Sequence, residues 1–177
     1  IDVGDFFLVE PSEIYAEQIR EYRQDFLDTN CSMDGCGPLR KCEDPFTYIS
    51  ECEKCTAQDT LPEGLVIATQ FFYVRKADNR LVGMIQVRHY FNDYLSKFGG
   101  HIGYSIRPSE RRKGYATSML NAILPYCREI GLDKLLITCI DGNIGSEKTI
   151  RNNGGVYEST VYESGKNCSL KRFWITL

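Results

Sequence analysis

A basic turn at residues 111–117 has the composition of a binding site for a phosphate group. Arg111, Arg112 and Lys113 precede Gly114, and apolar residues then follow at the spacing of an amphipathic helix. The first N–H groups of a helix have no acceptor within it and lie at the positive end of its dipole, so they bind anions. Gly114 would let a ligand approach the backbone closely. The turn therefore predicts an anion site, although an ordinary solvated turn can have the same composition.

The elements that must position this turn are a strand before it and a helix after it. Apolar residues alternate with small or polar ones over 101–106, which indicates a half-buried strand, and Pro108 ends this pattern. The helix is expected to reach about Ile130. A nearly continuous apolar run at 135–140 is typical of a strand buried on both faces. Because a helix separates the two strands, we expect them to be parallel neighbours joined by a crossover.

The rest of the chain alternates between strand and helix patterns, which indicates an α/β (α+β) fold. Antiparallel pairing is expected where a short polar turn joins two strands. The further predicted strands lie at 5–9, 66–74, 81–90, 156–162 and 169–177, and the further helices at 11–27, 44–57 and 143–152.

The composition favours a single domain over residues 1–177 and excludes several function classes. A content of 42% hydrophobic residues in 177 is enough for one sizeable core. The net charge of -3 argues against a dedicated nucleic-acid binder, whose binding face would be broadly basic. The longest apolar runs are too short to cross a membrane, and the first residues are acidic where a signal peptide would be basic. We therefore expect a cytoplasmic protein.

Eight cysteines require an interpretation of their own. Cys127 and Cys139 lie within helix and strand patterns and are expected to be small core residues. Five others cluster in the polar stretch 31–55, where Cys52 and Cys55 have the C-x-x-C spacing of a zinc hairpin. The spacing of the upstream cysteines does not supply a second tight hairpin. We therefore predict ordinary reduced cysteines and no metal, with a structural zinc as the alternative.

Three short motifs, in this order, resemble those of the GNAT superfamily of acetyl-CoA-dependent N-acetyltransferases. Arg111-x-x-Gly114-x-Ala116 resembles its R/Q-x-x-G-x-G/A signature, Asn143-Ile-Gly-Ser146 its N-x-x-A/S step, and Asn153-Gly-Gly its terminating N-G-G/F. The resemblance covers roughly Leu61 to Trp174. Within the superfamily, the phrase GGHIGYSIRPSERRKGYA looks most like a bacterial branch of predicted small acetyltransferases.

The resemblance implies a fold and a domain organisation. The GNAT fold has a mixed, mostly antiparallel sheet whose fourth and fifth strands are parallel and splayed, flanked by helices. The chain is expected to form one such domain over 1–177, with a cysteine-bearing helical and loop insertion at about 30–60.

The resemblance also implies which residues bind acetyl-CoA. Arg111 and Thr117 would add side-chain contacts at the pyrophosphate, and Ile106 and Arg107 would give main-chain hydrogen bonds to the pantetheine arm. Two residues near the pantetheine and the far end of the cofactor would be Asn143 and Ser146; Asn143 is also a good helix cap. The pyrophosphate itself would be held by the backbone amides of Arg112, Lys113, Gly114, Tyr115 and Ala116.

The expected reaction transfers an acetyl group to a primary amine by direct attack in a ternary complex. The amine must lose a proton, and His101 stands where many family members have a glutamate base. A hydrogen-bonded strand histidine is the alternative. Many members also have a tyrosine acid where this chain has Ile150, so Tyr115, Tyr157 or solvent would have to protonate the leaving thiolate.

The sequence does not identify the acceptor of the acetyl group, which could be an amine of a small molecule or of a peptide. We expect no nucleic acid and no membrane partner, and the resemblance leaves open both a monomer and a homodimer. Two other functions compete with the enzyme: a non-catalytic acyl-CoA-binding regulator, which the absent tyrosine favours, and a zinc-stabilised interaction module built on the cysteine cluster.

Overall fold

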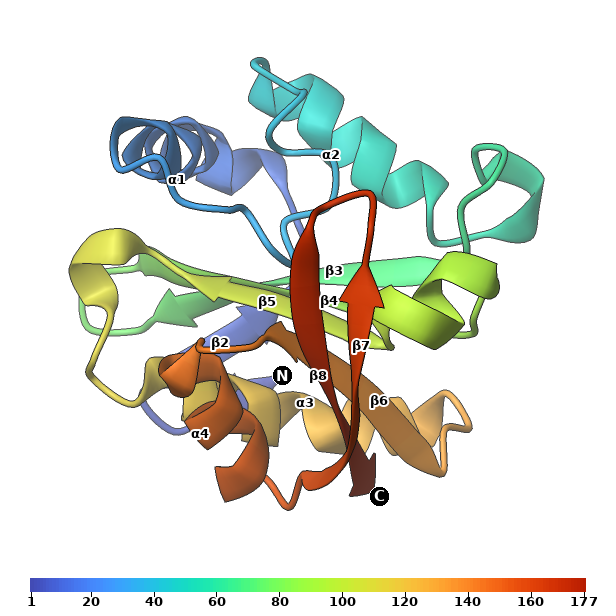
Figure 1. Cartoon of the computed structure of the whole chain (residues 1–177). Helices are drawn as coiled ribbons and strands as arrows, with labels where there is room; N and C mark the ends of the chain where they lie inside the picture. The colour runs from blue at the N-terminus through green and yellow to red at the C-terminus, as the bar shows by residue number, and fades with distance from the viewer.

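The computed structural model describes all residues from 1 to 177 and contains two antiparallel sheets (Figure 1). One sheet has five strands in sequence order, and the other has three strands in the order β6-β8-β7. The first sheet consists of β1 (Asp2–Val3), β2 (Phe6–Val9), β3 (Ala68–Arg75), β4 (Arg80–Arg88) and β5 (Ile102–Ile106). The second consists of β6 (Lys134–Ile140), β7 (Val156–Glu163) and β8 (Cys168–Thr176).

Helices lie on both sides of the five-stranded sheet. Figure 1 shows α1 (Ala16–Asp28) and α2 (Pro45–Lys54) over one face, with α3 (Tyr115–Glu129) and α4 (Ile144–Asn152) on the other side, next to the second sheet. The single-turn helical segments are η1 (Glu13–Tyr15), η2 (Gln58–Thr60), η3 (Leu95–Gly99) and η4 (Pro108–Glu110).

The central strand β3 explains why the molecule has two cores. Phe71 and Tyr73 belong to the cluster that α3 and the second sheet cover, whereas Phe72 and Val74 belong to the cluster beneath α1 and α2. Successive side chains of a strand point to opposite faces, so the continuous apolar run from Phe71 to Val74 must be covered on both. The expected core residues Cys127 and Cys139 are buried in the first cluster.

The predicted parallel pairing of the strands at 101–106 and 135–140 is wrong, because all pairings in both sheets are antiparallel. A single backbone hydrogen bond joins the two segments, from His101 N to Leu136 O at 2.7 Å. The same two residues form a second bond through the His101 side chain, whose Nδ1 accepts the Leu136 N–H at 2.9 Å. Beyond this junction β5 is an edge strand that pairs only with β4.

The stretch at about 30–60 forms a loop followed by α2. Asp44 caps α2 by accepting the Thr47 N–H, as its Asp-Pro sequence predicts. The loop presses against β5: a Cβ on Gly35 would lie 2.1 Å from the carbonyl oxygen of Gly103, so only glycine fits there. This loop therefore packs directly on the strand before the basic turn.

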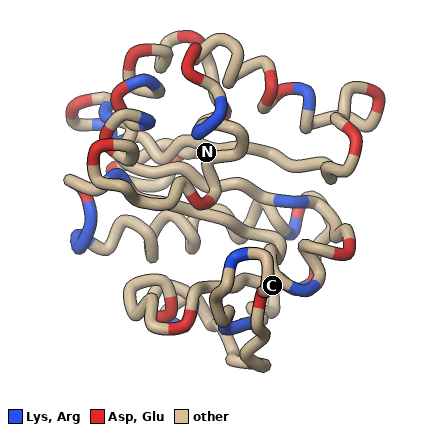
Figure 2. The backbone as a smooth tube through the Cα atoms, turned by 45° about the horizontal axis from the view of Figure 1, so that its top comes forward, with Lys and Arg blue, Asp and Glu red and all other residues tan.

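All eight cysteines are free thiols, and the structure contains no group of three or more His, Cys, Asp or Glu side chains arranged to hold a metal ion. Cys36 and Cys52 instead are buried beneath α1 and α2. None of the helices combines the length and the apolar character needed to cross a membrane. Figure 2 shows acidic and basic residues interspersed along the backbone.

Candidate functional site

The basic turn presents six consecutive backbone N–H groups without an acceptor. No hydrogen bond within the protein uses the N–H of any residue from Arg112 to Thr117, and the first helical donor is Ser118, which bonds to the Gly114 carbonyl. Residues 111–114 are exposed. Free amides at the positive end of a helix of 15 residues form an anion site. The predicted cradle is therefore present in the backbone.

Backbone torsion angles explain how the amides come to point the same way. Gly114, the N-cap of α3, has φ +81°, and Arg112 has φ +66°. The left-handed region is open to glycine but costs other residues free energy, so Arg112 is held there by its surroundings. Alternation between right-handed and left-handed residues makes successive N–H groups converge into a concave nest.

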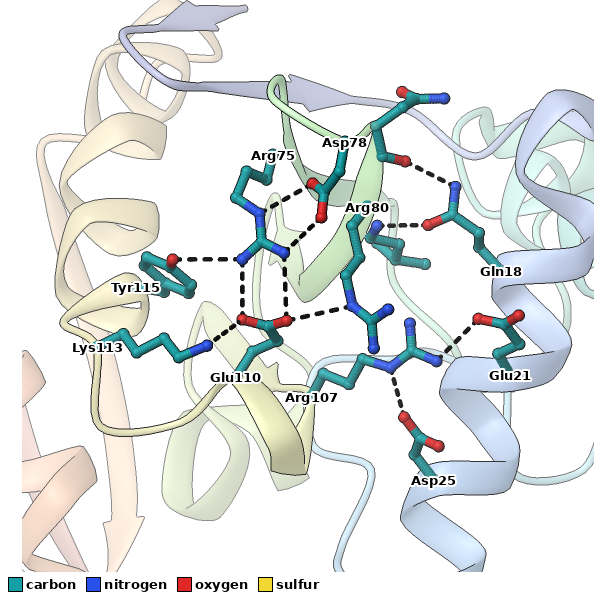
Figure 3. A network of polar contacts seen from close by, with 12 residues as sticks. Gln18, Glu21, Asp25, Arg75, Asp78, Arg80, Arg107, Glu110, Lys113 and Tyr115 are labelled. Atoms are coloured by element: carbon teal, nitrogen blue, oxygen red, sulfur yellow. Dashed lines mark hydrogen bonds and ion pairs between the residues drawn. The ribbon is translucent and has the colours of Figure 1, made fainter.

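A buried carboxylate at the start of the turn forms ion pairs that stabilise it. Glu110 has a side chain only 8% exposed, and it pairs with Arg75 at 2.9 Å and with Lys113 at 2.7 Å (Figure 3). Arg80 lies 3.2 Å from the other carboxylate oxygen. Burial raises the pKa of Glu110, but the hydrogen bonds from Arg75 and Lys113 outweigh it, and the pKa lies below its ordinary value. Glu110 is therefore ionised at neutral pH and holds the Lys113 ammonium in an ion pair.

Arg111 and Arg107 connect the turn to α1. The Arg111 Nε donates to the Ile106 carbonyl at 3.1 Å, and its guanidinium lies 3.3 Å from the Cys31 sulfur. Arg107, whose side chain is 3% exposed, pairs with Glu21 at 3.0 Å and also with Asp25 (Figure 3). The side chains of both arginines thus already have partners within the protein.

The free edge of β5 can pair with an extended ligand. Antiparallel pairing alternates, and Arg107 N–H bonds to the Val82 carbonyl while Arg88 N–H bonds to the His101 carbonyl. In this register Ile102, Tyr104 and Ile106 direct their backbone groups away from β4. The predicted pairing residue Ile106 is therefore on the free edge with its N–H unpaired, while its C=O accepts the Arg111 Nε. The N–H and C=O of Arg107 bond to Val82 and Glu110.

Residues of α4 face the same strand. Asn143 caps α4 by accepting the Ser146 N–H at 3.1 Å, and the Ser146 hydroxyl lies 2.7 Å from that of Tyr104. Asn153 at the other end donates to the Thr117 carbonyl at 3.2 Å and so ties α4 to the first turn of α3. The two family-like motifs in α4 thus flank β5 and the cradle.

His101 lies at the junction of the two sheets and is 6% exposed. Desolvation, with a smaller contribution from the positive charge of Arg88, lowers its pKa to about 4. Because Nδ1 accepts the Leu136 N–H, the single proton of the neutral ring resides on Nε2. The imidazole, which lies against Phe91 with centroids 4.0 Å apart, can therefore donate a hydrogen bond from Nε2.

The structure does not bring the predicted acids to His101. Tyr115 lies past the far end of β5, at roughly 16 Å for five residues of strand, and its hydroxyl is 3.4 Å from Arg75. Tyr157 lies on β7, two strands or roughly 10 Å from β6, and its hydroxyl bonds to Thr160. Ile150 is fully buried in the core.

Several site residues could not be identified from the sequence. Glu110 and Tyr104 looked like ordinary turn and strand residues, and their contacts come from segments distant in sequence. A further polar cluster lies near the start of β5, where the guanidinium of Arg88 donates to the carbonyls of Gly99 and Gly100. Beside it, the Tyr94 hydroxyl donates to Glu163 at 2.8 Å.

Comparisons with known proteins place this geometry in context. Residues 38–156 match the GNAT acetyltransferase domain model. The uncharacterized N-acetyltransferase YnaD of Bacillus subtilis is 30% identical over 88 residues, which are 49% of each chain. The match therefore spans about half the length of this relative.

Solved structures with low sequence identity share the fold. A ribosomal-protein-S5-alanine acetyltransferase from Vibrio fischeri has a TM-score of 0.74 at 15% identity, covering 99% of this chain and 95% of its own. The ribosomal L7/L12 α-N-protein acetyltransferase RimL, in complex with coenzyme A, has a TM-score of 0.73 at 14% identity. The match covers 100% of this chain and 97% of that structure's chain. The acetyltransferase MccE, in complex with acetyl-CoA and AMP, has a TM-score of 0.69 at 18% identity. The match covers 98% of this chain and 93% of that structure's chain.

Proposed function

Because the chain belongs to the GNAT acetyltransferase family, we propose that it is an acetyl-CoA-dependent N-acetyltransferase that acts on a primary amine. The observation that carries this proposal is the row of six unpartnered N–H groups from Arg112 to Thr117 at the start of α3. A pyrophosphate is the anionic part of coenzyme A and matches such a cradle in charge and in hydrogen-bonding capacity.

Different residues of the chain would bind different parts of acetyl-CoA. The amides of the turn would hold the pyrophosphate, and the free edge of β5 at Ile106 and Tyr104 would pair with the extended arm. Asn143 and Ser146 flank this edge from α4. When bound, acetyl-CoA supplies an acetyl group activated as a thioester. A free N–H on β5 would donate to the acetyl carbonyl oxygen as negative charge develops there.

We assign His101 a positioning role. A general base works best when its pKa lies near the operating pH, and desolvation holds the pKa of His101 at about 4. Its Nδ1 is also occupied by the Leu136 N–H. His101 instead fixes the junction where β5 leaves β6, and it offers an Nε2–H to a bound group. The amine proton would then pass to solvent.

A dedicated acid is not required for the leaving group. A thiol has a pKa of about 8.5, so a thiolate is a tolerable leaving group near neutral pH. This matters because Tyr115 and Tyr157 both lie away from His101, and Ile150 is buried. We therefore propose direct transfer in a ternary complex with solvent as the proton source.

Calorimetric titration with acetyl-CoA, followed by a screen of amines for release of coenzyme A, tests the proposal. We expect saturable binding and turnover with at least one amine. Absence of binding at high micromolar acetyl-CoA would contradict the cofactor assignment. Binding without turnover across the screen would instead support an acyl-CoA-binding regulator, the second candidate, which the buried Ile150 and the low pKa of His101 favour.

A further inference from the structure

The hairpin turn between β7 and β8 places an ammonium group close to a carboxylate, near the start of β5. Lys166 Nζ donates to the Tyr94 hydroxyl at 2.8 Å and lies 5.4 Å from the centre of the Tyr94 ring. Glu163 Oε2 is 3.9 Å from the same nitrogen. An aromatic face, a hydroxyl and a carboxylate thus surround one cation.

Glu163 is not fully satisfied by these neighbours. Its side chain is 7% exposed, and Oε1 accepts the Tyr94 hydroxyl at 2.8 Å, but Oε2 has no hydrogen-bond partner. A buried carboxylate oxygen without a donor is costly, so a donor at hydrogen-bonding distance would be stabilising. The Lys166 ammonium is too distant for this, and its side chain is 66% exposed and easily displaced.

This cluster lies next to the strand that is proposed to hold the acetyl group. The segment of Tyr94 is anchored over the second sheet, because Thr138 of β6 donates to the Phe98 carbonyl at 2.7 Å and Arg172 of β8 donates to the Ser96 carbonyl at 2.8 Å. Asp34, from the loop that packs on Gly103 of β5, lies within electrostatic range of Lys166. An amine seated here would therefore lie near β5.

Charge balance limits what the subsite can accept. Arg88 makes no ion pair, and Asp34 is the carboxylate within its electrostatic range. Glu163 is the carboxylate that lies within 4 Å of the Lys166 nitrogen, so the subsite balances one ammonium with one carboxylate. Replacing the Lys166 ammonium with one ammonium keeps this balance, whereas a second ammonium would add an uncompensated charge near Arg88.

We propose that Tyr94 and Glu163 form the acceptor's cation subsite, that Lys166 is its internal occupant, and that the acceptor is a primary amine with a single positive charge, such as a lysine side chain. This inference rests on the proposed acetyltransferase function. The Lys166 ammonium occupies the position of the acceptor's ammonium before the acceptor loses its proton and attacks. Lys166 and the acceptor therefore compete for one carboxylate.

Steady-state kinetics with Nα-acetyl-lysine methylamide and with spermidine test the subsite. We expect the monoamine to be preferred over the polyamine. Glu163→Gln should raise the acceptor KM about tenfold and leave the KM for acetyl-CoA unchanged, because it removes one charge-assisted hydrogen bond. Lys166→Ala should lower the acceptor KM, because the competitor is gone. Controls are Glu63→Gln and Lys41→Ala, two exposed residues without side-chain partners.

The outcomes separate this inference from the proposed function. Preference for spermidine, or an acceptor KM in Glu163→Gln within twofold of the wild type, would overturn it while leaving the acetyltransferase intact. Lys166 is exposed, so Lys166→Ala should fold normally, and an unchanged or raised acceptor KM there would also overturn it. If no amine is acetylated, an NMR titration of the coenzyme A-bound protein with Nα-acetyl-lysine methylamide decides: binding weakened by Glu163→Gln supports the subsite, and equal binding contradicts it.

Discussion

The two ends of β5 are built in different ways. At its C-terminal end, eight consecutive residues from Glu110 to Thr117 contain both the free amides and the carboxylate that supports them. At its N-terminal end, Asp34, Arg88, Tyr94, His101 and Glu163 come from five separate segments of the chain. The free amides of the first arrangement depend on local backbone conformation, with Arg75 and Arg80 as distant partners of its carboxylate. The second arrangement depends on how two sheets and a loop pack together. Binding of the cofactor and choice of the acceptor should therefore respond to different substitutions.

The largest expected effect is at Glu110. Glu110→Ala leaves Arg75, Arg80 and Lys113 without their shared carboxylate, and loss of one partner of a buried ion pair costs about 3 kcal/mol of unfolding free energy. Urea unfolding measures this, and acetyl-CoA binding should weaken as well. Glu17→Ala is the control, because Glu17 pairs with Arg20 on the exposed surface and should cost less than about 0.5 kcal/mol. If Glu110→Ala and Glu17→Ala lost the same unfolding free energy, the buried network would not stabilise the turn.

The second expected effect is a pH dependence of the unfolding free energy, which arises from His101 at the N-terminal end of β5. The pKa of His101 falls from 6.5 to about 4 on folding, so between these values the unfolded state binds more protons than the folded state. Stability should therefore fall by up to about 3 kcal/mol as the pH is lowered through this window. Denaturant unfolding at several pH values measures the loss, and His101→Asn should reduce it.

His101→Asn also separates positioning from base catalysis. Its side-chain oxygen can accept the Leu136 N–H in place of Nδ1, but it cannot accept the amine proton. We expect the amine acetylation rate of His101→Asn to stay within about tenfold of the wild type, and that of His101→Ala to fall further. A loss of 100-fold or more in His101→Asn, together with a lost limb in the pH–rate profile, would restore His101 as the base.

The smallest expected effect is at Gly114. Its φ of +81° makes Gly114→Ala cost about 1 kcal/mol of unfolding free energy, and the added methyl group would project into open space from the turn that carries the free amides. Gly64→Ala is a close match, since Gly64 also has φ +81° and open space at its Cβ position but lies outside the turn. Both variants should lose similar stability, and only Gly114→Ala should bind acetyl-CoA more weakly. If Gly114→Ala and Gly64→Ala weakened acetyl-CoA binding to a similar extent, the turn would not be the cofactor site.

Much of the fold was predictable because the patterns that define it are local. The strand at 101–106, the helix after the basic turn, the Asn143 cap and the Asp44 cap all occur where their residue types and spacing indicate. The helix predicted from residue 11 begins later than expected, because α1 starts at Ala16; before it, Ile14 is 79% exposed and the neighbouring Tyr15 is buried. A short 3-10 segment before α1 changes the helical phase there, and sequence periodicity does not reveal it.

By itself the sequence determined the anion cradle, since a glycine, a row of basic residues and a helix start are adjacent in the chain and dictate each other's backbone conformation. Tertiary structure alone decided the pairing of β5 and the polar cluster proposed to bind the acceptor. The strands at 101–106 and 135–140 are hydrogen-bonded to each other only at His101 and Leu136, where the imidazole accepts the Leu136 N–H. The free carboxylate oxygen of Glu163 lies where β7, η3 and a hairpin turn meet. Burial and charge balance at such a meeting point depend on long-range packing, which no local pattern encodes.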